Sequence, residues 1–520
     1  MIAKLFSSPF PLFIAGCLLV SPDLRGDATI ASVFGDNMVL QRNQENSVWG
    51  KADPGEVVTV TFAGVSVKGT ADPEGRWKAT LPALSVRRVG EDFAVRGTSG
   101  EEQVLSNVVV GEVWFFCGPS NILWSVRACD NPKEEVANAN YPEIRFFKTG
   151  RKLADVPQED CEGEWTVCSP RTVGVASGVA YFFSRKIHLD ADVPVGAMQS
   201  FWSSSRVEGW TSESSVRGVP ELNPIVDWWD KAVDGFDAVA SEERYAMAMK
   251  KWEAEAATAK TGGKPEPAKP RKAQSPAKST HKPGRLFNGM VNPLIPYGIR
   301  GAVTYQGLGN LYWAEHGKAL TSSMFKDWRE RWGQGAFPIG MIQPAPFDCS
   351  RYGKQNADAY AWQRENQLLI LEELPNMGLA PTMDLGEIDE IHFRNKQDVG
   401  KRMALWALAE VYGQKVAFAG PVYDSMKIEG NRIRVRFKNS GEGLMTSDKK
   451  SPSEFVIAGA DGKFFPADGI IEGDSVFLQS EKVPHPKAVR FAWSDTAISN
   501  LINSDGLPAS IFRSDSPKKQ

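Results

Sequence analysis

Apolar and polar residues alternate in the first part of the chain, and this pattern predicts β-strands. Val58, Val60 and Phe62 alternate with threonines, which is the period-two pattern of a half-buried strand. Turn sequences such as Asp-Pro-Gly at residues 53–55 separate the apolar runs. We therefore expect residues 29–106 to form a small β-sandwich domain.

After residue 106 the pattern changes, and short apolar runs alternate with stretches of helical periodicity. The apolar runs that predict strands are residues 108–117, 193–198, 299–305, 338–343 and 378–383. The stretches that predict helices are residues 177–189, 319–332, 359–373 and 396–412, the last with Asn395 as its N-cap. Strands that are apolar throughout and alternate with helices predict a mostly parallel sheet covered on both faces. Residues 107–414 are expected to form this α/β domain.

An insertion interrupts the alternation at residues 230–284. Its first half, residues 241–260, is rich in Ala, Glu and Lys and predicts a surface helix. Its second half is rich in Lys and Pro and ends in Lys282-Pro283-Gly284, which is typical of a loop. We expect a solvated insertion, with a docking arm for an acidic glycan as the alternative.

Strand patterning returns after Gly420-Pro421 near the end of the chain. Ile433, Val435 and Phe437 alternate with arginines, as in a strand with one buried face. Residues 415–515 are expected to form a second, C-terminal β domain.

Composition narrows the class of protein. The chain has 520 residues and 42% hydrophobic composition, enough for a large core and about two to four domains. Its formal net charge is −3, and no basic stripe is interleaved with aromatic residues. A nucleic-acid partner is therefore not expected. The oligomeric state is left open.

The N-terminus resembles an export signal. An apolar stretch at residues 5–20 is interrupted by Ser and Pro and is shorter than the roughly 20 apolar residues of a membrane span. We expect residues 1–28 to be a signal peptide, the protein to be periplasmic or extracellular, and no segment to span a membrane. Cys17 follows Ile14-Ala15-Gly16 as in a lipoprotein processing site, so a lipid anchor at Cys17 is the alternative.

Six cysteines are present. Cys161 and Cys168 are close enough in sequence to close a short disulfide loop in an oxidising compartment, although spacing alone fixes no connectivity. No group of residues has the spacing of zinc ligands. We expect neither a metal nor another cofactor.

A serine and a histidine are the candidates for chemistry. Ser120 follows the apolar run at 108–117, and ligands of α/β sheets gather at the carboxyl ends of strands. His392 lies between the last predicted strand and the last predicted helix, where a neutral imidazole is able to take the serine proton. Asp389 and Glu390 are both close enough to orient that imidazole. Individually, Ser120 in a turn and His392 at a helix start each have ordinary structural explanations.

A third element follows the run at residues 299–305, in the sequence Gln306-Gly307-Leu308-Gly309-Asn310. Glycines allow the backbone to approach a ligand closely, and the amide of Asn310 is a donor suited to a developing oxyanion. A Gly/Asn turn is the alternative explanation.

Together these stretches resemble the sialate O-acetylesterase family of the SGNH-hydrolase superfamily. The resemblance runs nearly from end to end, and its main motifs are Gly111-Glu112-Val113-Trp114, Ser120-Asn121, Glu208-Gly209-Trp210-Thr211-Ser212, Tyr305-Gln306-Gly307, and His392 followed by Asn395-Lys396-Gln397. It implies a three-layer, flavodoxin-like parallel sheet flanked by the two β domains.

The resemblance also implies roles for individual residues. Ser120 would attack an acetyl carbonyl, His392 would serve as base and then acid, and Asp389 or Glu390 would complete the triad. The oxyanion hole would consist of the Ser120 and Ser204 backbone N–H groups and the Asn310 amide. Asn121, Trp202 and Gln306 would bind substrate.

The sequence departs from the family pattern at positions beside the chemistry. Pro119 precedes the nucleophile and has no N–H. Ser203-Ser204 stands where the family carries two glycines, and a serine there is costly if the backbone needs a positive φ. Leu308-Gly309 replaces a carboxylate and a hydroxyl.

Two functions follow. The first is a carbohydrate O-acetylesterase that acts on acetylated glycan or sialic acid through an acetyl-enzyme. The alternative is a catalytically impaired homologue that binds glycans. The sequence does not choose between O-acetylated sialic acid and acetylated xylan as substrate.

Overall fold

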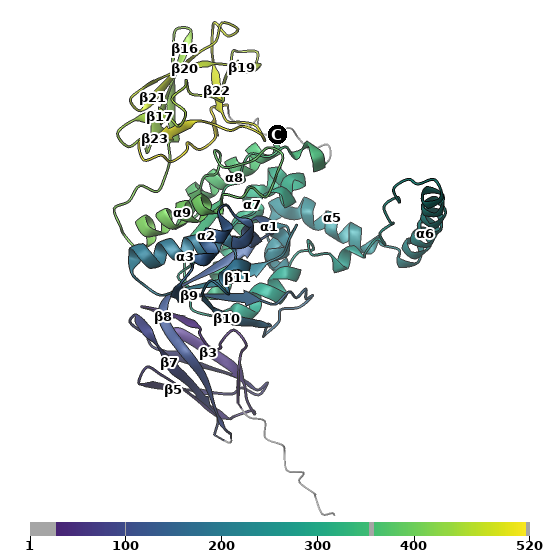
Figure 1. Cartoon of the computed structure of the whole chain (residues 1–520), viewed down its shortest axis with the longest axis vertical. Coiled ribbons are helices and arrows are strands. Elements are labelled where there is room, and N and C mark those ends of the chain that lie inside the picture. Colours follow the sequence, from purple (N-terminus) through teal and green to yellow (C-terminus); the bar gives the residue numbers. More distant parts are fainter. Residues whose placement is uncertain (1–27, 99, 353–357, 516–520) are drawn as a thin grey trace, which may run out of the picture.

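A computed structural model describes residues 28–98, 100–352 and 358–515 of the chain. Figure 1 shows an α/β body with one β-rich region at each end and a helical arm projecting from its side. The predicted signal peptide and Cys17 lie outside the described residues. Among the residues described, no helix is both long and apolar enough to cross a bilayer.

The N-terminal β-rich region consists of short antiparallel strands. One sheet joins β1 (Thr29–Ile30), β3 (Asn46–Lys51) and β6 (Arg76–Leu81); β4 (Val57–Phe62) pairs with β5 (Val65–Thr70) and β7 (Arg87–Arg96). In β4 the predicted alternation is confirmed, because Val58, Val60 and Phe62 are buried in the core of this region.

One long strand, β8 (Glu102–Gly118), connects this region to the α/β body. Its first half pairs with β7 and with β2 (Val39–Gln41), and its second half pairs in parallel with strands of the central sheet. The boundary expected after residue 106 therefore falls inside a continuous strand, and the division of the chain into domains stays a prediction.

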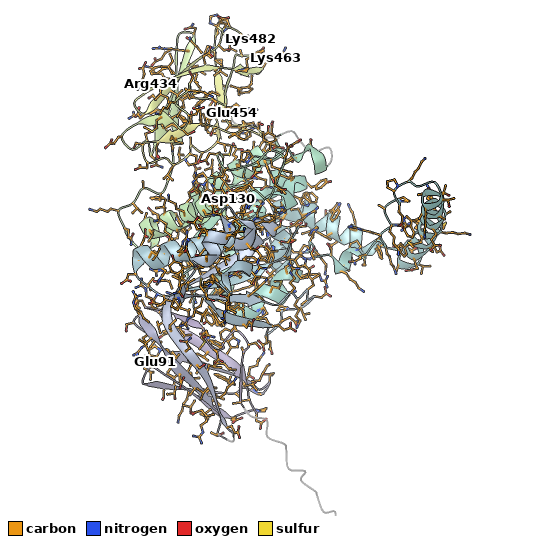
Figure 2. All side chains as sticks on the ribbon, viewed as in Figure 1. Glu91, Asp130, Arg434, Glu454, Lys463 and Lys482 are labelled. Atoms are coloured by element: carbon orange, nitrogen blue, oxygen red, sulfur yellow. The ribbon has the colours of Figure 1, made fainter. Side chains whose placement is uncertain are left out.

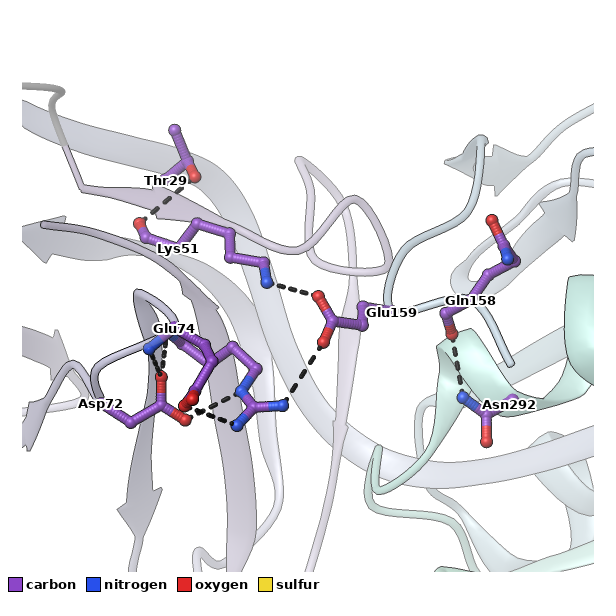
Figure 3. Close-up of polar contacts among 8 residues, drawn as sticks. Thr29, Lys51, Asp72, Glu74, Gln158, Glu159 and Asn292 are labelled. Atoms are coloured by element: carbon purple, nitrogen blue, oxygen red, sulfur yellow. Dashed lines mark hydrogen bonds and ion pairs between the residues drawn. The ribbon is translucent and has the colours of Figure 1, made fainter. Parts of the chain in front are cut away.

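Side-chain contacts reinforce this connection (Figure 3). Glu159, on a loop of the α/β body, forms ion pairs with Lys51 and Arg76 of the N-terminal sheet. Beside it, the Asn292 amide donates to the Gln158 carbonyl at 2.9 Å.

The central sheet has the order β10-β9-β11-β8-β12-β13-β14. Besides β8, its strands are β9 (Tyr141–Thr149), β10 (Gly163–Cys168), β11 (Val195–Phe201), β12 (Gly301–Thr304), β13 (Ile339–Ile342) and β14 (Met377–Ala380). All neighbours pair in parallel except the edge strand β10, which pairs antiparallel with β9. The sequence pattern found five of these strands and missed β9 and β10.

Successive residues of β8 point to different cores. Trp114 and Phe116 pack with residues of α3 (Gly178–Ala191) and α9 (Lys396–Trp406). Phe115 packs on the other face, against Trp328 of α7 (Gly317–Trp332). Helices therefore cover both faces of the sheet, as the continuous apolar runs predict.

The predicted helices are confirmed with small changes in their ends. Residues 359–373 form α8 (Ala359–Glu373), and Asn395 caps α9, its side chain accepting from the Asp398 N–H at 3.0 Å. The last turn of the predicted helix is a π-helix, η10 (Ala407–Val411). The shorter α-helices are α1 (Ser120–Leu123), α2 (Pro132–Ala137) and α4 (Glu213–Arg217).

The insertion forms the arm in Figure 1. It begins in α5 (Asn223–Asp234) and contains α6 (Ala238–Thr261), whose residues are exposed or half-exposed except Ser241. The Lys/Pro-rich segment then runs back along α6, and the Trp252 indole donates to the Pro267 carbonyl at 2.7 Å. The predicted surface helix is confirmed.

The C-terminal region holds a sheet of order β15-β16-β21-β20, a sheet of order β19-β18-β22-β24, and a pair, β17 with β23. The first sheet consists of β15 (Val422–Glu429), β16 (Arg432–Lys438), β21 (Ser475–Gln479) and β20 (Asp468–Glu472). The second consists of β19 (Phe464–Pro466), β18 (Phe455–Ala458), β22 (Ala488–Phe491) and β24 (Phe512–Arg513). The paired strands are β17 (Leu444–Thr446) and β23 (Leu501–Asn503). Figure 2 marks charged residues Arg434, Lys463 and Lys482 in this region. The region packs on α8, where the buried Arg364 donates to the Ser494 and Asp495 carbonyls.

The suggested disulfide between Cys161 and Cys168 is wrong. The five cysteines in the described part of the chain are all free and buried. Cys161 belongs to the core on one face of the central sheet and Cys168 to the core on the other. Burial raises the pKa of both thiols to about 12, so both stay protonated.

Candidate active site

The candidate nucleophile stands where β8 ends and α1 begins. Gly118 closes the strand with φ +147°, and a Cβ there would lie 2.8 Å from the Tyr305 carbonyl oxygen, so a glycine is needed. Pro119 is extended, and Ser120 is the first residue of α1. The side chain of Ser120 is therefore held at the carboxyl end of the central strand, half-buried, as the sequence predicts.

His392 meets this serine from the loop between β14 and α9. Its Nε2 lies 2.7 Å from the Ser120 Oγ. The imidazole stacks on the Trp124 ring at a centroid distance of 4.8 Å and an interplanar angle of 5°. The structure thus brings together two residues 272 positions apart, in the geometry that proton transfer needs.

Glu390 provides the carboxylate beside this histidine. Its Oε1 lies 3.5 Å from His392 Nδ1 and accepts the His392 backbone N–H at 2.8 Å. Asp389, the other candidate, is exposed in the same loop. The contact with Nδ1 favours Glu390 as the third member, although its side chain is 53% exposed and water weakens the pair.

The charge state of His392 suits a general base. Burial lowers the pKa of His392 below its usual 6.5, the Glu390 carboxylate opposes that shift, and the Lys396 ammonium adds to it. Near pH 7 the ring is therefore neutral and able to accept the serine proton.

Asn121 lines the main cavity, and its amide also makes hydrogen bonds within the protein. Its Nδ2 donates to the Ile391 carbonyl at 3.0 Å, and its Oδ1 accepts from the Lys396 ammonium at 2.9 Å. Lys396 also donates to the Phe393 carbonyl at 2.7 Å. Both ends of the Asn121 amide are therefore used to join α1 to the loop that carries His392.

Lys396 is a residue whose role in the site the sequence reasoning missed. It is the first residue of α9 and is fully buried. Burial lowers the pKa of Lys396 to about 7. The signal was present as the Asn395-Lys396-Gln397 motif, but its contact with Asn121 depends on the fold.

Ser204 lines the same cavity as the catalytic pair. It occupies a turn at residues 202–205, closed by a hydrogen bond from the Ser205 N–H to the Trp202 carbonyl at 3.2 Å. Its φ is +58°, in the left-handed region that favours glycine. Serine therefore replaces the family's glycine at a position where a Cβ makes the backbone conformation less favourable.

Asn310 is not brought to the cavity. Its Nδ2 donates to Glu208 Oε2 at 2.8 Å, and its Oδ1 accepts the Val207 N–H at 3.0 Å. Glu208 is fully buried, and desolvation raises its pKa. The amide predicted to serve the oxyanion hole is instead held by this carboxyl and lines a smaller cavity behind the main one.

Trp202 and Gln306 also lie outside the main cavity. Trp202 is half-buried against the core, with the Arg151 guanidinium 5.6 Å from its ring centre. The buried Gln306 amide lines the smaller cavity beside Asn310, and in the described structure it has no hydrogen-bond partner. Neither residue is among those that line the cavity holding Ser120, and their predicted contact with substrate stays a prediction.

The main cavity has a volume of about 320 Å³. Ser120, His392, Ser204, Arg206 and His281 are among the residues that line it. His281 comes from the end of the insertion, and its Nε2 lies 2.6 Å from the Ser204 carbonyl oxygen. Sequence reasoning missed His281 and Arg206, because neither stands in a motif that marks a site.

Metal chemistry was not expected. In the described residues, no cluster of three or more His, Cys, Asp or Glu side chains has the arrangement of a metal site. The polar residues that line the main cavity are Ser120, Asn121, Ser204, Ser205, Arg206, His281, His392 and three tyrosines, Tyr305, Tyr312 and Tyr360.

Comparison with known proteins finds similar proteins that are named as esterases. No family model matches the chain. The chain is 25% identical over 442 residues to the sialate O-acetylesterase of Homo sapiens, covering 76% of this chain and 74% of that protein. It is 26% identical over 468 residues to the sialate O-acetylesterase of Rattus norvegicus, covering 80% of each.

A solved structure extends this similarity to the fold. The crystal structure of a carbohydrate acetylesterase from Xanthomonas citri matches with a TM-score of 0.79 and 29% identity, over 94% of this chain and 100% of that one. The α/β body with its β-sheet regions therefore fits the fold of a carbohydrate acetylesterase. The resemblance to the sialate O-acetylesterase family, predicted from the motifs, is confirmed by these relatives.

Proposed function

We propose that this protein is a carbohydrate O-acetylesterase that hydrolyses acetyl esters on sugars through Ser120. The observation that carries the proposal is the 2.7 Å contact between Ser120 Oγ and His392 Nε2 at the wall of the cavity. The related proteins are named for the same chemistry, which supports an acetylated glycan or sialic acid as substrate.

The reaction proceeds in two halves. His392 Nε2 takes the proton of Ser120, and Oγ attacks the acetyl carbonyl to form a tetrahedral intermediate. His392 then gives that proton to the departing sugar oxygen, which leaves an acetyl group on Ser120. A water molecule, deprotonated by His392, attacks the acetyl-enzyme, and acetate departs as the serine regains its proton.

Other residues support these steps. Glu390 holds the imidazole with its Nδ1 proton toward the carboxylate, so that Nε2 is free to accept. The backbone N–H groups of Ser120 and Ser204 are the proposed donors to the oxyanion. We assign the α/β body to the three-layer SGNH-hydrolase type and the protein to an exported location, periplasmic or extracellular.

Acetate release tests the proposal. Wild type and Ser120→Ala are incubated with O-acetylated sialic acid and with acetylated xylan, and free acetate is measured. We expect release by the wild type from at least one substrate and none above background by Ser120→Ala. Circular dichroism of both proteins checks that the variant is folded.

A specific observation favours a second function, a glycan-binding protein on an impaired esterase scaffold. The Asn310 amide is bound to Glu208 and does not line the cavity that holds Ser120. Loss of one oxyanion donor typically costs about 100- to 1000-fold in rate. Equal, negligible acetate release by wild type and Ser120→Ala, together with binding of either glycan in calorimetry, would establish this second function.

A further inference from the structure

The turn at residues 202–205, which contributes Ser204 and Ser205 to the cavity wall, has a backbone conformation that its sequence disfavours. Ser204 is the third residue of the turn at 202–205, and a positive φ at this position is normally supplied by glycine or asparagine. The Cβ of a serine is crowded in this conformation. A contact from outside the turn would offset this cost.

His281 makes the contact that does so. Its Nε2 lies 2.6 Å from the carbonyl oxygen of Ser204. Because a carbonyl oxygen only accepts hydrogen bonds, the ring proton must lie on Nε2. The bond fixes the orientation of the peptide group that follows Ser204, and this orientation is coupled to the φ and ψ of the turn.

The insertion delivers this histidine at a fixed place. Just after His281, the Gly284 N–H donates to the Glu208 carbonyl at 3.1 Å. Just before it, the Thr280 carbonyl approaches Gly209 so closely that a Cβ there would lie 2.6 Å from the oxygen. The His281 backbone N–H donates to the Ser279 hydroxyl at 3.1 Å. The end of the insertion is thus anchored beside the turn on both sides of His281.

We propose that His281 is a positioning residue that holds the 202–205 turn in its positive-φ conformation, and with it the Ser204 N–H that we assign to the oxyanion hole. The insertion is then part of the active site, through one hydrogen bond to the backbone. The catalytic consequence rests on the proposed esterase function, whereas the effect on the turn does not.

The contact does not require a charged imidazole. Burial and the neighbouring Arg206 lower the pKa of His281, so the ring is neutral near pH 7. Nε2 carries a proton in the required neutral tautomer and in the cation alike. A glutamine side chain also carries an N–H donor, whereas alanine carries none.

A double-mutant cycle between His281 and Ser204 tests the proposal. The variants are His281→Ala, Ser204→Gly and the double variant, each compared with wild type for kcat and KM on 4-nitrophenyl acetate. We expect His281→Ala to lower kcat about tenfold with little change in KM, because the displaced N–H acts on the transition state. In the Ser204→Gly background the same change should cost less than about threefold, since glycine adopts a positive φ unaided.

Two further variants separate positioning from general damage. His281→Gln should recover most of the lost kcat. His485→Ala, which removes an exposed histidine of the C-terminal region, should leave kcat as in wild type. An equal loss from His281→Ala in both backgrounds would overturn the proposal.

Urea unfolding of the same four proteins tests the turn without any substrate. If His281 holds the turn, the free energy lost through His281→Ala is smaller when residue 204 is glycine; additive losses would overturn the proposal. A wild type with no Ser120-dependent hydrolysis would refute the esterase function alone, and the unfolding cycle would still decide whether His281 holds the turn.

Discussion

Two parts of the cavity wall differ in how the chain holds them. Around Ser120, hydrogen bonds among Ser120, Asn121, His392 and Lys396 tie α1 to the loop before α9. In the 202–205 turn, Ser204 sits at a positive φ beside a contact from the insertion. The difference teaches that the nucleophile and base are assembled by redundant contacts, whereas the proposed oxyanion donors depend on a strained turn.

The largest effect should come from removing the general base, His392. We expect His392→Ala to lower kcat/KM by on the order of 10⁴-fold or more, because no other group at Ser120 is placed to take its proton. Hydrolysis of 4-nitrophenyl acetate measures this. His316→Ala, at the start of α7, is the control and should change the rate by less than about twofold. Similar losses in both variants would contradict the role of His392.

The next largest effect should come from replacing the buried Lys396, which contacts Asn121 and the loop that carries His392. Lys396→Met removes the donor to Asn121 and Phe393 but keeps the length of the side chain. We expect kcat/KM to fall about 100-fold through misplacement of His392.

The pH profile of Lys396→Met provides a second measurement. In wild type, kcat/KM should rise with pH until His392 is neutral and then level off, with the midpoint below pH 6.5. Since the Lys396 ammonium lowers the pKa of His392, its removal should move this midpoint to higher pH. Lys401→Met, an exposed lysine on the same helix, should leave both the rate and the midpoint unchanged.

A smaller effect should identify the third member of the triad. Glu390→Gln keeps an acceptor for the His392 backbone N–H but removes the charge beside Nδ1. We expect kcat/KM to fall about tenfold, less than for a buried triad carboxylate, because solvent screens this pair. Asp389→Asn is the matched variant and should cost less than about twofold. The reverse order would assign the role to Asp389.

The smallest effect should come from relieving the backbone strain at Ser204. Ser204→Gly removes the crowded Cβ at φ +58° but adds conformational freedom to the unfolded chain. The balance of these two contributions should raise the free energy of unfolding by about 0.5 kcal/mol. Urea titration measures it, with Ser203→Gly as the neighbouring control, for which only a loss is expected. A loss of stability in Ser204→Gly would show that the serine is not strained.

Much of the fold was predictable because it is local. The alternation at Val58, Val60 and Phe62 and the run of apolar residues in β8 follow from which face each residue buries. Strand β9 was missed because its second and third residues are Pro142 and Glu143, which do not resemble an interior strand. The length of β8 was also missed, since it depends on partners on both of its halves.

The sequence by itself determined five of the seven strands of the central sheet, the position of Ser120 at the end of a strand and of His392 on the loop before the last helix, and the likeness to carbohydrate esterases. Tertiary structure decided that Glu390 contacts His392 Nδ1, that Asn121 joins α1 to the loop that carries His392, that Asn310 turns to Glu208, and that His281 reaches Ser204. The physical reason is the distance in sequence over which the determining contacts act. Periodicity records which face a residue buries, whereas the direction of a polar side chain depends on partners that lie tens to hundreds of positions away.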